Sequence, residues 1–283
     1  MPAINYEVEY DNRARVPEHP EIFARWQREA AAFRAAARGA ELGLRYGPGP
    51  RQTVDLFPAK GDDARTPLAL YIHGGWWRSL EPAMFSHMAA GANAHGVTVA
   101  LAGYELCPQV GIAQIIEQMR SACLWLWRKQ RKRMVVYGHS AGGHLAACLL
   151  AQDWKAFASD APVDLVPAAY AISGVFDLSP LTQVSMNQDL RLDEAEARRV
   201  SPLHWKVPAG RSFDAVVGGI ESSEFLRQSK IIADGWRARG VATRFEEIAG
   251  ANHFTAIDPL SDANSAMTKR VAELARLANV MAL

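Results

Sequence analysis

The sequence predicts an α/β protein in which helices cover both faces of a mainly parallel central sheet. Two observations lead to this fold class: short β-type runs alternate with longer helical stretches, and the interiors of the strand-like runs are almost wholly apolar. Strands that are buried on both faces have this pattern. The chain of 283 residues suits one such domain, although two domains of ordinary size would also fit.

The first predicted element is an amphipathic helix over residues 19–39. Apolar side chains such as Ile22 and Trp26 fall near helical spacing in a run rich in Ala, Arg and Glu, and Gly39 is a typical helix end. The GPGP run at 47–50 then interrupts the chain.

Beyond this break, strand-like and helix-like runs follow one another. Strands are expected at 53–57, 67–72, 97–102, 133–137, 168–173, 213–218 and 243–248. Helices are expected near 82–95, 108–130, 141–153, 222–239 and 262–279. Most strands are therefore followed by a helix, which is the order that a parallel sheet requires.

One segment, about residues 175–212, breaks the alternation because it is polar, contains three prolines and carries a charged run. We expect a lid-like insertion there, and a plain surface helix between loops fits equally well. The chain 1–283 is then a single domain, with residues 1–46 as an N-terminal helical extension. In this interpretation the extension is decoration around the catalytic unit.

Composition and charge exclude several classes of partner. Lys plus Arg number 31 and Asp plus Glu number 30, a net charge of +1, so no basic surface for nucleic acid or for an anionic membrane is indicated. No run approaches a membrane span, and the first residues lack the apolar core of a signal peptide. The three cysteines lie among apolar neighbours without CxxC spacing, as reduced buried thiols do. We expect a cytoplasmic protein acting on a small molecule, and a homodimer is left open.

The strongest functional signal is the pentapeptide GHSAG at 138–142, between the strand-like RMVVY and the helix-like AGGHLAACLLA. A G-x-S-x-G sequence in this position is typical of a nucleophile elbow, in which small neighbours let a tight turn present the serine hydroxyl. A Gly-rich turn without a catalytic role is the alternative. A phosphate loop is excluded because no Lys-Ser/Thr pair follows the glycines. Ser140 is the expected nucleophile.

A second signal, HGGWW at 73–77, follows the strand expected at 67–72. Acyl transfer places negative charge on a carbonyl oxygen, and a glycine-rich backbone can bring N–H donors close to it. We expect an oxyanion hole formed by the amides of Gly75, Trp76 and Ala141. A simple Gly-Gly turn at the end of a strand is the alternative.

A serine nucleophile also needs a base and an acid. Of the eight histidines, His253 lies soon after the last predicted strand, where the chain order Ser, acid, His places the base. Glu221 follows the strand expected at 213–218 and is the expected acid, which would hold the imidazole in the useful tautomer. Asp177, after the preceding strand, is the rival for this role.

Four aromatic residues near predicted strand ends are candidates for a substrate pocket, and ordinary core packing is the alternative for each. They are Trp77, Tyr104, Phe176 and Phe254. No pair of histidines or carboxylates has metal-ligand spacing, and HEXXH is absent. The expected chemistry needs neither a metal nor a cofactor.

These motifs resemble those of the α/β-hydrolase superfamily, in the branch with an HGGG-like oxyanion motif, and within it those of the kynurenine formamidases (arylformamidases). HGGXW is matched at 73–77, GHSAG followed by HLA at 138–146, and a DSPEF-like segment followed by RQS by ESSEFLRQS. FEEIAGANHF is similar to the segment that carries the family's histidine, and SGVFDLSPL is similar to the family's SGIYDL. The resemblance runs from about residue 70 to 257.

The resemblance implies an acyl-enzyme mechanism with Ser140, Glu221 and His253 and a formyl aryl amide such as N-formylkynurenine as substrate, hence a place in tryptophan catabolism. The chain departs from the family at Glu221, where Asp is usual, and at the bulky Trp76. Two other functions remain open. A general short-chain carboxylesterase would use the same residues, and a non-catalytic ligand receptor on this fold is disfavoured by the intact serine and histidine.

Overall fold

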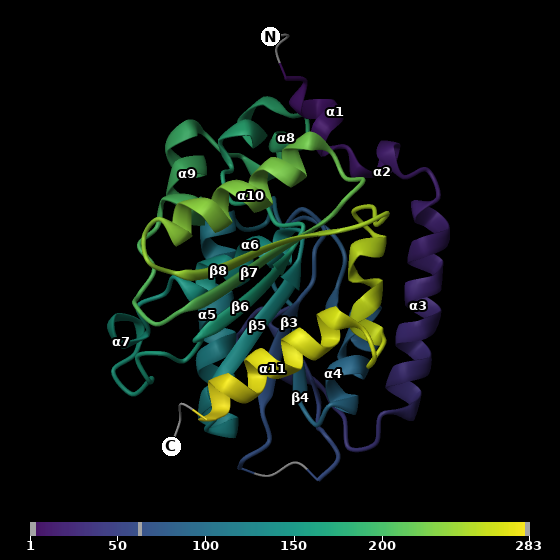
Figure 1. The fold of residues 1–283 in the computed structure, drawn as a ribbon, viewed down its shortest axis with the longest axis vertical. Coiled ribbons are helices and arrows are strands. Elements are labelled where there is room, and N and C mark those ends of the chain that lie inside the picture. The colour runs from purple at the N-terminus through teal and green to yellow at the C-terminus, as the bar shows by residue number, and fades with distance from the viewer. Residues whose placement is uncertain (1–3, 62–63, 281–283) are drawn as a thin grey trace.

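The computed structural model describes residues 4–61 and 64–280, and a single 8-stranded sheet lies at its centre (Figure 1). The strands lie in the order β1-β2-β4-β3-β5-β6-β7-β8. β2 is antiparallel to both β1 and β4, and all the other neighbours are parallel. The strands are β1 Glu41–Arg45, β2 Thr53–Phe57, β3 Leu68–Ile72, β4 Thr98–Ala102, β5 Met134–His139, β6 Ala168–Ile172, β7 Ser212–Gly218 and β8 Ala242–Ile248. The predicted mainly parallel sheet is confirmed.

Helices connect the strands and cover the sheet. The α-helices are α1 Tyr6–Tyr10, α2 Asn12–Arg15, α3 His19–Ala36, α4 Ala90–Ala94, α5 Ile112–Gln130, α6 Ala141–Leu150, α7 Trp154–Phe157, α8 Asn187–Leu190, α9 Glu194–Arg199, α10 Ser223–Arg237 and α11 Ala266–Val280. The 3-10 helices are η1 Pro82–Ala89, η2 Ser179–Gln183, η3 Pro202–His204 and η4 Thr255–Ser261. In the described part of the chain, no helix is both long enough and apolar enough to cross a membrane.

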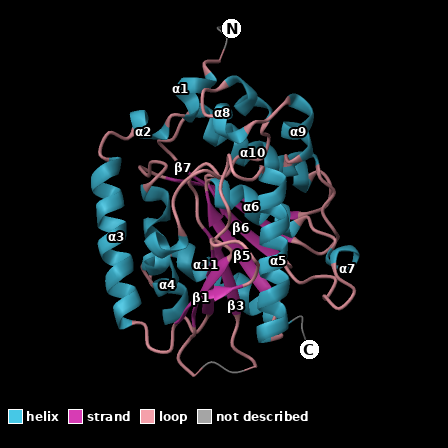
Figure 2. Ribbon diagram, turned by 180° about the vertical axis from the view of Figure 1, so that it is seen from behind, coloured by secondary structure: helices cyan, strands magenta, loops and turns pink. Residues whose placement is uncertain are grey.

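The core has two layers, one on each face of the sheet, which Figures 1 and 2 show from opposite sides. Side chains alternate between the layers: Leu70 and Ile72 pack with residues of α5, α6 and α10, whereas Tyr71 packs with residues of α3, α4 and α11. Because both faces are covered, the central strands are apolar at nearly every position. This explains why they were readable as uninterrupted apolar runs.

Every predicted strand occurs, but short and exposed elements escaped prediction. β1 is an edge strand with mostly exposed side chains, so its sequence has little apolar pattern. α1 and α2 are too short for helical periodicity. They are capped by the preceding Asn5 and Asp11, whose side chains accept hydrogen bonds from the first turn. The helix predicted at 82–95 is a 3-10 helix followed by the short α4.

The segment predicted as lid-like holds η2, α8, α9 and η3. Several of its apolar side chains, among them Leu181, Leu190 and Ala197, are buried, so the segment packs against the domain as a cap. That it moves as a lid stays a prediction. The N-terminal helix α1 contacts both η2 and α10 (Figure 1), which brings the first described residues to the carboxyl ends of the strands.

Candidate active site

The turn between β5 and α6 holds Ser140 in a strained backbone conformation, with φ 56° and ψ −118°. Such a conformation persists only where the surrounding structure enforces it, and it is typical of functional sites. Gly142 permits the turn because a Cβ at this position would lie 1.9 Å from the carbonyl oxygen of Ile72. The elbow is thus pressed against the end of β3, and Ser140 lines a cavity at this edge of the sheet.

The loop after β3 lies directly against this serine. A Cβ on Gly74 would lie 3.0 Å from the Ser140 Cβ, and Gly75 and Trp76 line the same cavity as Ser140. Over residues 4–61 and 64–280, the backbone N–H groups of Gly75, Trp76 and Ala141 have no hydrogen-bond acceptor. All three donors are therefore available to an oxygen of a bound molecule.

Buried side chains hold this loop from behind. His73 Nδ1 is 2.7 Å from the Gly74 carbonyl oxygen, and the Tyr104 hydroxyl donates to the His73 carbonyl oxygen at 3.0 Å. The His73 and Tyr104 rings stack with centroids 4.5 Å apart. Burial lowers the pKa of His73 to about 4, so the imidazole is neutral near pH 7 and its Nδ1–H donates to the loop.

Glu221 and His253 form a buried pair in which His253 Nδ1 lies 2.6 Å from Glu221 Oε2. The other carboxylate oxygen, Oε1, accepts hydrogen bonds from the Ser173 hydroxyl at 2.5 Å and the Gly218 amide at 2.7 Å. Three donors from three segments thus fix the carboxylate. With Nδ1–H donated to Glu221, the Nε2 atom of His253 is the free ring nitrogen.

Asp177, the rival acid, lies elsewhere. Its side chain accepts a hydrogen bond from the Ser179 amide at 3.1 Å, which caps a local turn. Gln228 fixes the Asp177 backbone through both its amide nitrogen and its carbonyl oxygen. The structure therefore brings Glu221, and not Asp177, to His253.

His139, which precedes the serine, is a second buried imidazole at the site. Its Nε2 lies 2.8 Å from the His253 carbonyl oxygen, and the two rings are 4.7 Å apart. Burial and the adjacent His253 lower the pKa of His139 well below its usual value. His139 is therefore neutral and holds the backbone of the histidine loop in place.

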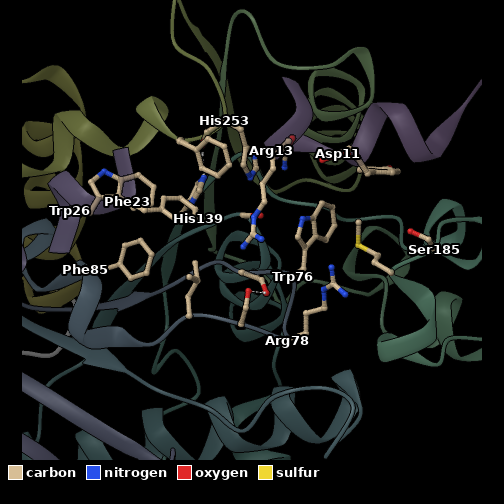
Figure 3. A pocket seen from close by; sticks show the side chains of 18 of the residues that line it. Asp11, Arg13, Phe23, Trp26, Trp76, Arg78, Phe85, His139, Ser185 and His253 are labelled. Carbon is tan, nitrogen blue, oxygen red and sulfur yellow. Dashed lines mark hydrogen bonds between the residues drawn. The ribbon is translucent and has the colours of Figure 1, made fainter. Parts of the chain in front are cut away.

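The cavity beside Ser140 is walled by aromatic side chains, several of which are labelled in Figure 3. Trp76 comes from the loop after β3, Phe85 from η1, and Phe254 follows His253. Phe23 and Trp26 come from α3, and the Phe23 and Phe254 rings pack edge to face at 5.2 Å. The cavity is thus suited to a flat apolar group.

Of the four predicted pocket residues, only Phe254 lines this cavity. The prediction is wrong for Trp77, Tyr104 and Phe176, which are fully buried in the core. Trp77 packs edge on against His144, Tyr104 supports the loop at His73, and Phe176 packs against Phe213. Proximity to a strand end does not decide which way a side chain points, and these three rings point inward.

Sequence reasoning missed the contribution of the N-terminal extension to the site. Tyr10, Asn12 and Arg13, together with Phe23 and Trp26, line the cavity, so the extension is a wall of the site and not decoration. No local signal marks these residues, because only the packing of α1 to α3 against the domain brings them there. Ser173 was also missed, although it is the last residue of the strand predicted at 168–173 and directly follows β6.

Within the described ranges, no three His, Cys, Asp or Glu side chains come together in a way that would hold a metal ion.

Comparison with known proteins gives relatives for most of the chain. Residues 69–257 match a family model described as the alpha/beta hydrolase fold. The kynurenine formamidase of Danio rerio is 29% identical over 234 residues, which cover 79% of this chain and 78% of that protein. The kynurenine formamidase of Drosophila melanogaster is 31% identical over 227 residues, which cover 76% of this chain and 75% of that protein.

A solved structure of similar fold is that of a candidate thioesterase from Silicibacter sp. tm1040. It superposes with a TM-score of 0.85 at 31% sequence identity, over 95% of this chain and 99% of that one. The likeness therefore extends beyond the family-matching residues to the N-terminal extension.

Proposed function

The chain belongs to the α/β-hydrolase family and is a hydrolase, and we propose that it cleaves the formyl amide of an aromatic amine, of the N-formylkynurenine type. The observation that carries the proposal is the Glu221–His253 pair, whose histidine lines the same aromatic-walled cavity as Ser140. A formyl group needs almost no room on the acyl side. The aromatic side chains that line the cavity are then available to pack against the aromatic amine.

In the first half of the proposed reaction, the Ser140 hydroxyl attacks the formyl carbon while His253 Nε2 takes its proton. The carbonyl electron pair moves to oxygen, and the free amides of Gly75, Trp76 and Ala141 stabilise the oxyanion. When the C–N bond breaks, His253 gives the proton to the departing nitrogen. An aromatic amine leaves, and a formyl ester remains on Ser140.

In the second half, water attacks the formyl ester and His253 takes a proton from it. The new oxyanion collapses, the bond to the serine oxygen breaks, and His253 returns the proton to Ser140. Formate is the product. The Glu221 carboxylate stabilises the imidazolium that forms twice in each cycle.

The test is to compare formate release from N-formyl-L-kynurenine with turnover of acetyl and butyryl aryl esters. We expect the formamide to have the largest kcat/KM. Ser140→Ala should abolish turnover of every substrate, because no other group in the cavity forms the acyl intermediate. Turnover retained in this variant would contradict the mechanism.

A general short-chain carboxylesterase is the second proposed function, favoured by the likeness to a candidate thioesterase. The same three residues serve esters and amides, so only the cavity distinguishes these substrates. Ester turnover without formate release from the formamide would establish this alternative. A non-catalytic receptor is the least favoured function, and hydrolysis of any of these substrates by the wild-type protein excludes it.

We also propose that the enzyme works in the cytoplasm on a small molecule. The support is that Cys107, Cys123 and Cys148 are all free and buried, as is usual for a reducing compartment. Cell fractionation tests this location. The homodimer left open by the sequence stays a prediction that sedimentation would decide.

A further inference from the structure

The rim of the cavity carries two arginines, and only one of them has an ionic partner. Arg78 Nη1 lies 2.5 Å from Asp189 Oδ2. Arg13, from α2, lines the same cavity and appears among its side chains in Figure 3. Within the described part of the chain, no carboxylate lies within ion-pair distance of Arg13, and its guanidinium carbon lies 5.9 Å from the Phe23 ring centroid. The Arg13 guanidinium thus lies at the cavity without an ion-pair partner among the described residues.

The neighbouring Asn12 provides a second, independent observation. Its side chain is only 5% exposed and lines the cavity, and its buried Nδ2 has no hydrogen-bond partner in the described residues. Leaving a buried amide donor unpaired is unfavourable, and a bound acceptor would remove this cost. Adjacent residues of α2 therefore present a cation and an unused N–H donor to the same space.

The segment that carries these groups is held firmly. The Tyr10 hydroxyl donates to Glu224 Oε2 at 3.0 Å and accepts from Gln228 Nε2 at 3.0 Å. The Tyr10 ring packs edge on against Trp76, with centroids 5.7 Å apart. Tyr10 thereby ties the segment both to α10 and to the loop that carries two of the proposed oxyanion donors.

The acidic residues of the segment already have donors. Glu7 accepts hydrogen bonds from the Ser185 amide and hydroxyl, and Glu9 accepts from the Ser223 hydroxyl. Asp11 Oδ1 accepts from an amide of α2, which it caps. These carboxylates are thus engaged in structure, and none of them neutralises Arg13.

We propose that Arg13, assisted by the Asn12 amide, binds a carboxylate on the amine portion of the substrate, so that the enzyme selects aryl amides that carry a carboxylate there. The inference rests on the proposed function and adds a specificity-determining residue to it. A formyl group has no position for a second substituent, so the carboxylate belongs to the leaving group. A guanidinium matches a carboxylate with paired N–H donors, which an ammonium group cannot do.

The test compares two formamides that differ only at the end remote from the reaction. N-formyl-L-kynurenine carries the amino-acid carboxylate, and its decarboxylated analogue, kynuramine formylated on the aniline nitrogen, has the same ring, ketone, formamide and amino group without it. The measured quantity is the ratio of their kcat/KM values. Arg13→Met keeps the stem that contacts Phe23 but removes the charge, and it should lower this ratio about tenfold, mainly through KM.

Two variants serve as controls. Arg13→Lys keeps the charge without the fork, and it should restore part of the ratio, which a purely structural role would not predict. Arg28→Met removes an exposed arginine of α3 that does not line the cavity, and both substrates should be turned over as in the wild type. A ratio unchanged by Arg13→Met overturns the inference and leaves the proposed function intact.

The inference remains testable if the formamides are not substrates. In that case the proposed function fails, and the same variants are assayed with 2-acetoxyacetophenone and 4-(2-acetoxyphenyl)-4-oxobutanoate. These aryl esters again differ by a remote carboxylate. A tenfold fall in their ratio supports the role of Arg13 in an esterase, and an unchanged ratio overturns it.

Discussion

Glu221 stands where a shorter acid is usual in the family that the chain resembles, and its surroundings show how the longer side chain is accommodated. Its Oε1 accepts hydrogen bonds from the Ser173 hydroxyl and the Gly218 amide, and its Oε2 is the atom next to His253 Nδ1. A Cβ on Gly218 would come within 3.0 Å of Glu221 Oε1, so only glycine leaves room for the carboxylate here. Held in this way, the longer side chain places Oε2 2.6 Å from His253 Nδ1.

The two candidate acids, Glu221 and Asp177, give a direct prediction for single substitutions. Glu221→Ala should lower kcat about a thousandfold, because the imidazole loses both its orientation and the charge that stabilises its protonated form. Asp177→Ala removes only a turn cap and should leave kcat within about threefold of the wild type. The measurement is kcat with one aryl substrate for both variants. The opposite order of effects would move the acid to Asp177.

A single residue could be predicted from the sequence where its role depends on its immediate neighbours in the chain. Ser140 and the glycines beside it form a turn whose backbone geometry demands those residue types, so a short motif identifies them. Glu221 and His253 were found from chain order after strands. Tyr104 was assigned to the pocket, and its hydrogen bond to His73 shows that it supports the loop from the core. The side to which a buried ring points depends on neighbours distant in sequence.

Among the elements, α1 has the largest effect on the site for its length. It has five residues, too few to be stable alone, and its position is set by contacts with α10 and η2. Strands and long helices were predictable because an apolar period repeats within them. α1, α2 and β1 were not, because their order comes from tertiary contacts and their own sequences carry little pattern.

The docking of α1 gives a prediction for the element as a whole. Tyr10→Phe removes the hydroxyl shared by Glu224 and Gln228, and it should lower the free energy of unfolding by about 1–2 kcal/mol. KM should rise as well, because without these two hydrogen bonds the segment that lines the cavity is held less firmly. The matched control is Tyr6→Phe, since the Tyr6 hydroxyl has no hydrogen-bond partner among the described residues and its ring stacks on Tyr10. Equal effects of the two changes on urea unfolding would contradict the role of the Tyr10 hydroxyl.

For the whole molecule, the two-layer core contains imidazoles that must stay neutral. Burial lowers the pKa of both His73 and His144 to about 4, whereas an unfolded histidine has its ordinary value of about 6.5. Below pH 6.5 the unfolded chain therefore binds protons that the folded chain does not. The stability associated with the neutral form is complete above pH 6.5 and is lost as the pH falls toward 4.

We expect the urea midpoint to fall between pH 7.5 and pH 5, with each of these histidines contributing about 2 kcal/mol to the loss at pH 5. His144→Gln keeps a donor for the Val200 carbonyl oxygen, which His144 Nε2 contacts at 2.7 Å, and should make the pH dependence shallower. His204→Gln replaces an exposed histidine and should leave the dependence unchanged. An identical slope in His144→Gln and the wild type would contradict this account.

The first described residues line the cavity but supply none of the proposed catalytic groups. Substrate binding and catalysis therefore depend in part on different stretches of the chain. The proposed chemistry lies in turns at strand ends between residues 73 and 253, whereas Asn12, Arg13, Phe23 and Trp26 precede every strand of the sheet. Substitutions in the early run leave the hydrogen-bond ladder of the sheet untouched. Exchanging this N-terminal segment between relatives should therefore change which substrate is bound and leave the reaction itself unchanged. Laboratory evolution of substrate selectivity should begin with these residues.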